Sequence, residues 1–318
     1  MKILESVNAL VWGLPALAAI LGVGLYLTVR TGFVQLRLFH AAFRRFAGMF
    51  RKGEKGDDFT GRQALFTALA ATVGTGNLVG VAGAICLGGP GAVFWMWIAG
   101  LLGMCTKYCE ALLAVRYRVK RDGEFHAGPM YIISRGMGDK WKPMALVYAA
   151  FGVFASFGVG NATQISSVIG GISGLLPGEK LLSGFGFRLL FGIALGLLIW
   201  QLLMGGGKRI GKCAEMLVPV VSGGYIILCL MALICRWRAV PQALCAIFQG
   251  AWDPRSVTGG AVGSMFAALR VGCARGVFTN EAGLGTAGIA HGAALVKHPA
   301  QQGLMGIMEV FQIGRAHV

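Results

Sequence analysis

The protein has 318 residues, of which 56% are hydrophobic and only 13% are charged, and its mean hydropathy is +0.68. Soluble globular domains carry about 25% charged residues, so this composition excludes a soluble domain and predicts a chain that lies mostly in lipid. The net charge is +16. The 29 Lys and Arg residues lie between apolar runs, however, which is typical of topology determinants and not of a surface that binds nucleic acid.

Apolar runs long enough to cross a bilayer recur along the whole chain. About 18 apolar residues suffice for a helix that crosses the hydrocarbon core. The 44 residues between Arg62 and Lys107 carry no formal charge, so they predict two crossings joined by a turn at Gly88-Gly89-Pro90-Gly91. The predicted fold class is an all-α polytopic membrane protein. Its crossings lie near 7–29, 64–86, 91–115, 143–171, 189–205, 214–235 and 260–288, with an eighth that begins near 300.

The basic residues are distributed unequally between alternate loops. The segments 30–62, 116–142 and 208–212 hold 18 Lys and Arg, whereas the segments 1–6, 172–188 and 236–259 hold six. Basic loops stay in the cytoplasm. The pattern therefore predicts an N-terminus outside the cell and a first helix, 7–29, that is retained and not cleaved as a signal peptide.

Two glycine-rich stretches are expected to break helices in mid-membrane. They are 71–77 in the second crossing, which includes Gly74-Thr75-Gly76-Asn77, and 276–285 in the seventh. A broken helix is tolerated in a bilayer only where protein or a watery cavity satisfies the freed backbone groups. Such breaks at corresponding positions of two halves are typical of carriers built from inverted repeats.

The spacing of the breaks predicts where the repeats lie. A first repeat at 64–235 and a second that starts at 260–311 would form one transporter domain over 1–311, and the second repeat would then extend to about residue 430. We therefore expect most of the second repeat to lie beyond this chain, and we expect residues 1–318 alone not to transport. The last residues, 312–318, have the composition of a sequencing or cloning scar.

The eight cysteines contain no C-x-x-C pair. Cys105 and Cys109 lie one helical turn apart inside a predicted crossing. We interpret the cysteines as small apolar packing residues and expect neither a disulfide nor a zinc framework.

The segment 88–97, Gly-Gly-Pro-Gly-Ala-Val-Phe-Trp-Met-Trp, resembles a signature of the alanine or glycine:cation symporter family. The stretch 74–77, the Lys107-Tyr108 pair with Glu110, and the stretch 275–283 followed by Ile289-Ala290-His291 extend the resemblance. The resemblance implies a LeuT-type fold of five-plus-five helices with an additional N-terminal helix. It also implies uptake of alanine or glycine with sodium, occasionally protons, across a bacterial plasma (inner) membrane, with no other cofactor.

The first break has the chemistry that such a function needs. Freed N–H groups at the start of a half-helix attract a substrate carboxylate, which predicts substrate contacts at Gly74, Thr75, Gly76 and Asn77. The resemblance further implies that the backbone carbonyls just before the glycines bind sodium. The corresponding residues are Ala70 and Val73, with Thr72 as a third candidate. The alternative for a lone G-x-G is a packing contact.

Further candidates lie on the fourth and seventh crossings. Asn161 and Gln164 share a helix face, and either a substrate contact or an interhelical hydrogen bond would explain them. Phe278 and Thr279 lie within the second glycine-rich stretch and could close over the methyl group of the substrate, and Asn280 offers an amide beside it. The alternative for Phe278 is simple packing.

Charged and aromatic residues of the crossings have simpler interpretations. A carboxylate in a membrane segment needs a partner, and Arg275 or a neighbouring backbone terminus could serve Glu281. We interpret Arg275 and Glu281 as a structural or gating pair, with substrate binding as the alternative. Lys107 and Glu110 are spaced for a pair on one helix. Trp95 and Trp97 follow the predicted turn and are typical of membrane-interface anchors.

Other classes of protein fit less well. A membrane enzyme would need a nucleophile, a paired histidine or a metal cluster at one depth, and the histidines are scattered along the sequence. A channel would typically repeat one pore motif by oligomerisation, whereas this chain has two different breaks. Another LeuT-type amino-acid or cation-coupled carrier remains the alternative.

Overall fold

The computed structural model describes residues 13–51, 60–157, 159–175, 184–252 and 265–315. This part of the chain is helical apart from one antiparallel hairpin of β1 (Val119–Arg121) and β2 (Glu124–His126). The helices in chain order are α2 (Leu14–Arg30), α3 (Val34–Arg37), α4 (Phe39–Arg51), α5 (Gly61–Thr72), α6 (Thr75–Gly88), α7 (Gly91–Tyr117), α8 (Pro129–Ile132), α9 (Lys142–Phe157), α10 (Val159–Leu175), α12 (Phe185–Leu203), α13 (Gly206–Cys235), α14 (Val240–Trp252), α15 (Met265–Asn280), α16 (Thr286–Gly292) and α17 (Pro299–Arg315). Short π and 3-10 turns lie at Ile133–Met137, Asp139–Trp141 and Trp237–Ala239.

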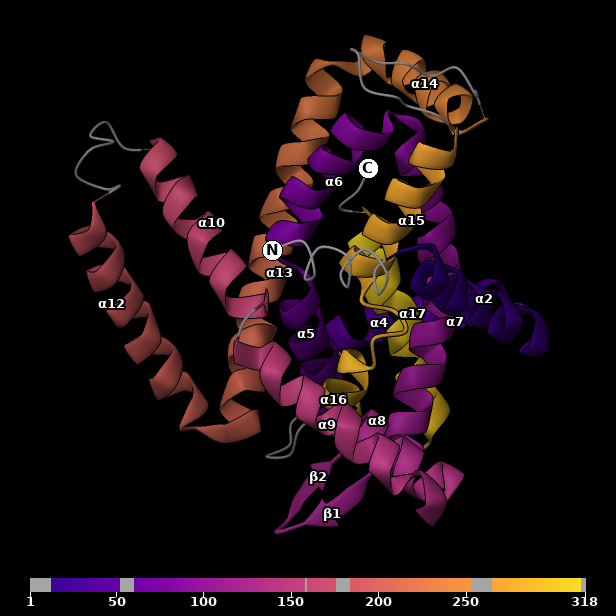
Figure 1. Ribbon diagram of the computed structural model, residues 1–318, viewed down its shortest axis with the longest axis vertical. Coiled ribbons are helices and arrows are strands. Elements are labelled where there is room, and N and C mark those ends of the chain that lie inside the picture. Colours follow the sequence, from indigo (N-terminus) through magenta and orange to yellow (C-terminus); the bar gives the residue numbers. More distant parts are fainter. Residues whose placement is uncertain (1–12, 52–59, 158, 176–183, 253–264, 316–318) are drawn as a thin grey trace.

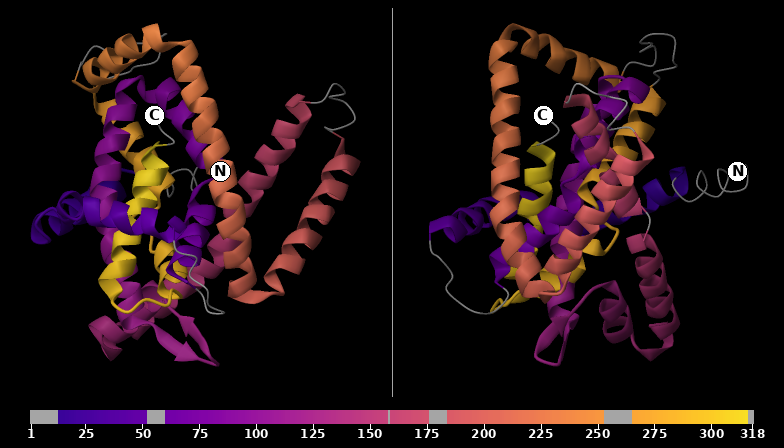
Figure 2. Two further views of the ribbon diagram at one scale, coloured as in Figure 1. Left: turned by 180° about the vertical axis from the view of Figure 1, so that it is seen from behind. Right: turned by 90° about the vertical axis from the view of Figure 1, so that its left-hand side faces the viewer.

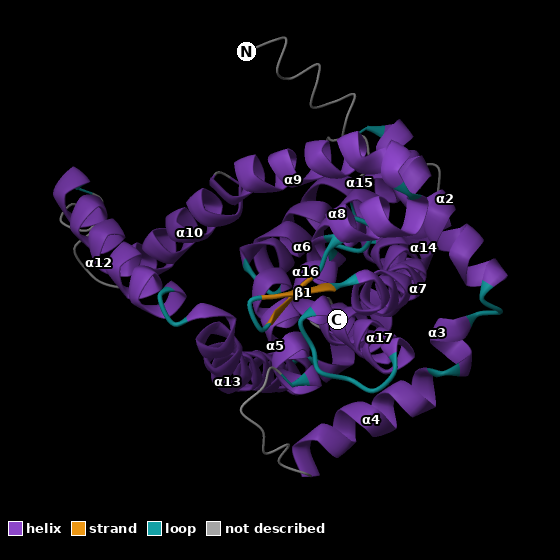
Figure 3. Cartoon of the chain, turned by 90° about the horizontal axis from the view of Figure 1, so that it is seen from below, coloured by secondary structure: helices purple, strands orange, loops and turns teal. Residues whose placement is uncertain are grey.

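The bundle is built around α7, which packs against α15 and α17 along most of its length (Figure 1). The helix α13 extends along the height of the molecule beside α5 (Figure 2). Seen from below, α7, α13 and α17 are viewed nearly end-on, whereas α2 and α4 run across the view around their outside (Figure 3). The first predicted crossing is therefore helical, but its helix runs across the bundle and not alongside α7.

Large apolar side chains cover much of the outer surface. Phe154 on α9 is 74% exposed and Phe185 on α12 is 82% exposed. Water would disfavour such a surface, but lipid does not. Three helices within the described residues, α7, α12 and α13, are long and apolar enough to cross a membrane. These features support the predicted all-α membrane protein.

Both predicted helix breaks are confirmed. The first separates α5 from α6 at Val73 and Gly74. The second is shorter than the stretch 276–285, because α15 stays helical through Asn280 and the chain leaves the helix at Glu281. Gly276 serves instead for close packing, since a Cβ atom there would lie 2.7 Å from the Cβ of Ala99 on α7.

The turn between α6 and α7 is also confirmed. Gly89 has a φ of +71°, which favours glycine, and Pro90 caps the start of α7. Gly91 packs so closely against the backbone of Gly250 on α14 that no side chain would fit between them.

Aromatic rings hold α14 onto the upper end of α7. Phe94 and Trp95 contact the ring of Trp252 with centroids 5.8 Å and 5.6 Å apart, and Phe248 lies 5.7 Å from Phe94. Trp95 donates a hydrogen bond to the carbonyl of Ala251. The sequence predicts a loop at 236–259, but residues 240–252 of this segment form the helix α14. The prediction is wrong there because an amphipathic helix of 13 residues is too short to be recognised as a crossing.

Two of the three basic segments, 116–142 and 208–212, lie at one end of the molecule. The hairpin, α8 and the turn between α12 and α13 lie at the lower end in Figure 1, whereas α14 lies at the upper end. The third basic segment, 30–62, differs, because its helix α4 lies nearer mid-height.

We expect the end that carries the hairpin to face the cytoplasm. In a variant without the natural cysteines, Arg121→Cys on β1 should resist a membrane-impermeant maleimide in intact bacterial cells, and Arg238→Cys beside α14 should react. Both side chains are exposed, so permeabilised cells, as the control, should label both positions. Labelling of residue 121 alone in intact cells would reverse the predicted orientation.

Candidate functional site

The first break puts an extended segment between two half-helices. Val73 closes the last turn of α5 with a 2.7 Å hydrogen bond to the carbonyl of Leu69, and Val73 and Gly74 then adopt extended backbone angles. Within the described residues, no backbone hydrogen bond outside the helices ends at the carbonyl of Ala70 or Val73. These two carbonyls therefore remain candidates for binding a cation.

Asn77 bridges the break. Its Nδ2 donates a 3.1 Å hydrogen bond to the carbonyl of Thr72, the last residue of α5. The side chain is 3% exposed, and its Oδ1 has no hydrogen-bond partner in the part of the chain that the structure describes. A buried carbonyl oxygen without a hydrogen-bond partner costs free energy. This atom therefore favours a ligand that donates a hydrogen bond or carries positive charge.

The second break is held by side chains from other helices. Glu281, Gly283 and Gly285 have φ values of +50°, +94° and +83°. The carboxylate of Glu110 accepts a 2.7 Å hydrogen bond from the backbone N–H of Gly283. Tyr148 on α9 donates a 2.9 Å hydrogen bond to the carbonyl of Leu284.

The predicted site residues of the two interrupted helices come together at Gly76. A Cβ atom there would lie 3.1 Å from Cε1 of Phe278 on α15. A Cβ atom at Gly74 would lie 3.1 Å from Nε2 of Gln164 on α10. Gly74, Gly76, Gln164 and Phe278 thus lie close together, and a side chain at either glycine would require its neighbour to shift. The side chains of Thr75 and Asn161, two further candidates, lie outside the described residues.

Thr279 and Asn280 face the interior near α7. The hydroxyl of Thr279 donates to the carbonyl of Arg275, 2.8 Å away in its own helix. Asn280 is 1% exposed, and its amide atoms have no hydrogen-bond partner within the described residues. Its Nδ2 lies against Gly100 of α7, where a Cβ atom would come within 3.3 Å.

A cavity of about 250 Å³ opens beside the first break. Val73, Gly74 and Asn77 form part of its wall, and Ser222 and Tyr225 of α13 line the other side. The remaining lining is mostly apolar. Sequence reasoning misses the contribution of α13, because nothing in an apolar crossing indicates which of its faces meets a cavity.

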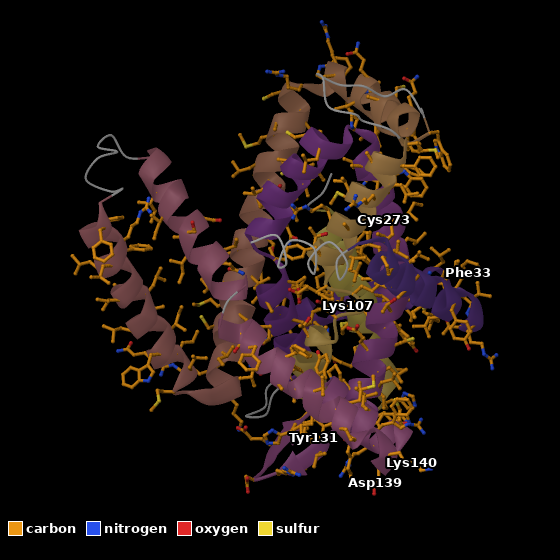
Figure 4. All side chains as sticks on the ribbon, in the orientation of Figure 1. Phe33, Lys107, Tyr131, Asp139, Lys140 and Cys273 are labelled. Atoms are coloured by element: carbon orange, nitrogen blue, oxygen red, sulfur yellow. The ribbon has the colours of Figure 1, made fainter. Side chains whose placement is uncertain are left out.

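A charged network lies at the centre of the bundle. Lys107 on α7 and Glu309 on α17 are both fully buried, and Lys107 Nζ lies 2.9 Å from Glu309 Oε1. Nε2 of His291 on α16 lies 2.8 Å from Glu309 Oε2, and Gln302 contacts His291 Nδ1 at 2.7 Å. The hydroxyl of Thr72 lies 3.2 Å from Glu309 Oε1 and 2.8 Å from the carbonyl of Ala68, so these two acceptors share its one proton. Figure 4 shows Lys107 deep in the molecule, away from both of its ends.

Two predicted ion pairs are wrong in this structure. Lys107 pairs with Glu309 and not with Glu110, because α17 fills the side of α7 toward which Lys107 points. Glu281 accepts a 2.7 Å hydrogen bond from Thr286 across the second break, whereas the guanidinium of Arg275 lies 5.9 Å from the ring of Phe278. The only signal for Glu309 in the sequence is one acidic residue in an apolar run, and it does not indicate a partner 202 positions away.

Interrupted membrane helices with free carbonyls, an unpaired amide and a central buried ion pair define a polytopic membrane protein of the transporter class. The sequence matches the sodium:alanine symporter family over residues 1–313, and the chain belongs to that family. This confirms the resemblance found in the sequence.

Named relatives agree with this assignment. The chain is 41% identical to an uncharacterised transporter of Haemophilus influenzae over 98% of its own length and 66% of the relative. It is 39% identical to the sodium/alanine symporter AgcS of Methanococcus maripaludis, over 98% of the chain and 67% of the relative. It is 38% identical to the amino-acid carrier protein AlsT of Bacillus subtilis, over 92% of the chain and 59% of the relative. The chain thus spans about two thirds or less of the length of these relatives.

We expect Lys107→Ala to destabilise the protein strongly. It would leave the carboxylate of Glu309 buried without its cation, and removing one partner of a buried pair costs about 3–5 kcal/mol. The measurement is the thermal unfolding midpoint of the purified protein in detergent. The control is Lys142→Ala, whose 2.9 Å pair with Asp139 is exposed and contributes at most about 1 kcal/mol. Equal midpoints for the two variants would contradict the prediction.

Proposed function

We propose that this chain carries the substrate and ion site of a sodium-coupled symporter for a small neutral amino acid, alanine or glycine, that works by alternating access. The observation that carries the proposal is the first break. Among the described residues, the carbonyl of Ala70, in the last turn of α5, and the carbonyl of Val73, at the break, accept no backbone hydrogen bond from outside the helices, and the buried Oδ1 of Asn77 has no partner. Hard carbonyl oxygens from unwound backbone suit sodium.

The proposal includes the architecture that the family resemblance implies. The fold would be LeuT-type, with one transporter domain over 1–311, repeats at 64–235 and from 260, and an additional N-terminal helix. The protein would lie in a bacterial inner membrane with its N-terminus outside and its basic loops in the cytoplasm. The two interrupted helices, which approach each other at Gly76 and Phe278, support a site between two halves that move against each other.

Within the site, each group has a proposed role. The N–H groups at the start of α6, with Gly74, Thr75 and Gly76, would bind the substrate carboxylate. Asn77 and Gln164 would supply amides, and Phe278, packed at Gly76, would limit the size of the substrate. Arg275, inside α15, and Glu281, where the chain leaves that helix, would have separate structural or gating roles. The further candidates for substrate contact are Asn161, Thr279 and Asn280.

The function is tested by uptake of labelled alanine into cells or liposomes that contain the protein expressed from its complete reading frame. An inward sodium gradient should drive saturable accumulation, and replacement of sodium by choline should abolish it. Uptake that rises linearly with alanine concentration would favour a channel instead.

We expect Asn77→Ala to lower sodium-dependent alanine uptake by about fivefold to 150-fold, because a buried polar contact contributes about 1–3 kcal/mol. Membrane expression should stay unchanged. The control is Gln201→Ala, which removes an amide from the outer helix α12 and should transport like the wild type. Wild-type kinetics in Asn77→Ala would exclude this residue from the site.

We expect Gly76→Leu to abolish alanine binding, since Phe278 already lies within contact distance of a Cβ atom at this position. Gly83→Leu is a matched control on the same helix, because a Cβ atom at Gly83 meets nothing within 4 Å. Equilibrium binding of labelled alanine to the purified protein distinguishes them. Tight binding by Gly76→Leu would show that the substrate does not approach the backbone here.

A further inference from the structure

We infer that Glu309 is a positioning residue for the first helix break, and that through this break it sets the affinity for sodium. The inference rests on the proposed function. Glu309 lies on α17, is fully buried, and shares hydrogen bonds with side chains of three other helices. These helices are α5, α7 and α16, so the contacts join separate parts of the bundle.

The carboxylate of Glu309 is fixed from two sides. Lys107 Nζ at 2.9 Å and the hydroxyl of Thr72 at 3.2 Å both lie at Oε1. His291 Nε2 lies at 2.8 Å from Oε2. His291 Nδ1 lies 2.7 Å from Nε2 of Gln302, which fixes the orientation of the ring. Lys107, Thr72 and His291 together contact both oxygens of the carboxylate and hold it in a single orientation.

A chain of hydrogen bonds leads from Glu309 to the break. Thr72 is the last residue of α5, and its hydroxyl also lies 2.8 Å from the carbonyl of Ala68. The carbonyl of Thr72 in turn accepts the 3.1 Å hydrogen bond from Asn77, the third residue of α6. The order Glu309, Thr72, Asn77 thus spans both ends of the break. We call these three residues the break tether.

The break tether determines where the proposed sodium ligands lie. Ala70 and Val73 flank Thr72 along the chain, so a shift of Thr72 displaces both carbonyls. Cation binding by carbonyl oxygens depends on holding several of them at a fixed distance from the ion, and partners behind the ligands commonly provide this. Loss of the contact between Glu309 and Thr72 should therefore weaken sodium binding even though neither of these two side chains needs to touch the ion.

The test must separate positioning from folding. A single neutralisation of the pair would leave a buried charge, but replacement of both partners by apolar residues is often neutral for stability. We therefore choose the double variant Lys107→Met/Glu309→Leu and the single variant Thr72→Val, which keeps the ion pair and removes only the hydroxyl. The matched control is Asp139→Leu/Lys142→Met, which removes an exposed ion pair of the same charge types.

The readout is the sodium concentration that gives half-maximal alanine uptake, measured at saturating alanine with the protein expressed from its complete reading frame. We expect this concentration to rise about tenfold in the double variant and in Thr72→Val, and to stay at the wild-type value in the control. A triple variant that combines all three substitutions should show no further rise, since both changes interrupt one tether. The maximal uptake rate at saturating sodium should change much less than the half-saturation value.

Three outcomes overturn the inference. They are a wild-type half-saturation value in a folded double variant, a wild-type value in Thr72→Val, and a triple variant in which the two effects multiply. If the double variant does not fold, Thr72→Val alone decides. Absence of sodium-dependent uptake by the wild type would overturn the proposed function itself, whereas intact wild-type uptake with unshifted variants overturns only the role of Glu309.

Discussion

A backbone that leaves the helix inside a membrane must find hydrogen-bond partners in the protein, because lipid offers none. This constraint explains most of the interior of the molecule. At the first break the amide of Asn77 returns to the carbonyl of Thr72. At the second break Glu110 and Tyr148 reach the backbone of Gly283 and Leu284 from α7 and α9. The first break is thereby closed locally, whereas the second is tied to helices that are distant in sequence.

The same constraint explains which backbone groups stay available. The partners satisfy some groups at each break and leave others free, notably the carbonyls of Ala70 and Val73. Groups left free in this way inside a bilayer are expected only where a cavity or a ligand can serve them. The cavity that reaches Val73, Gly74 and Asn77 lies at this place. Glycine-rich helices alone would not explain why the unpaired carbonyls and the cavity occur at the same place.

The large elements are predictable from the sequence because hydrophobicity and glycine content act locally. The long charge-free run between Arg62 and Lys107 predicts two helices, and the glycines at 74 and 76 predict the break between them. The partners of buried charges cannot be predicted in this way. Lys107 is spaced equally well for Glu110 on its own helix, and only the packing of α17 against α7 brings Glu309 to it. The helices α4 and α14 escape prediction because they are too short to cross a bilayer.

Glycine illustrates both the success and the failure of sequence reasoning. Gly76 and Gly276 stand in similar glycine-rich motifs, yet Gly76 follows a break whereas Gly276 lies inside a regular helix and permits close contact with Ala99. A glycine that frees the backbone and a glycine that removes a side chain are identical in sequence. Only the neighbouring helix distinguishes them.

The attachment of α14 to α7 has a mechanical consequence. The rings of Phe94 and Trp95 pack against the ring of Trp252, and Gly91 contacts the backbone of Gly250. These contacts allow little relative movement of the two helices. Because close-packed interfaces shift between discrete arrangements and do not deform smoothly, the upper ends of α7 and α14 should behave as one stiff block. We then expect the helices to bend at the residues that have left the helix, so that the two breaks would act as hinges.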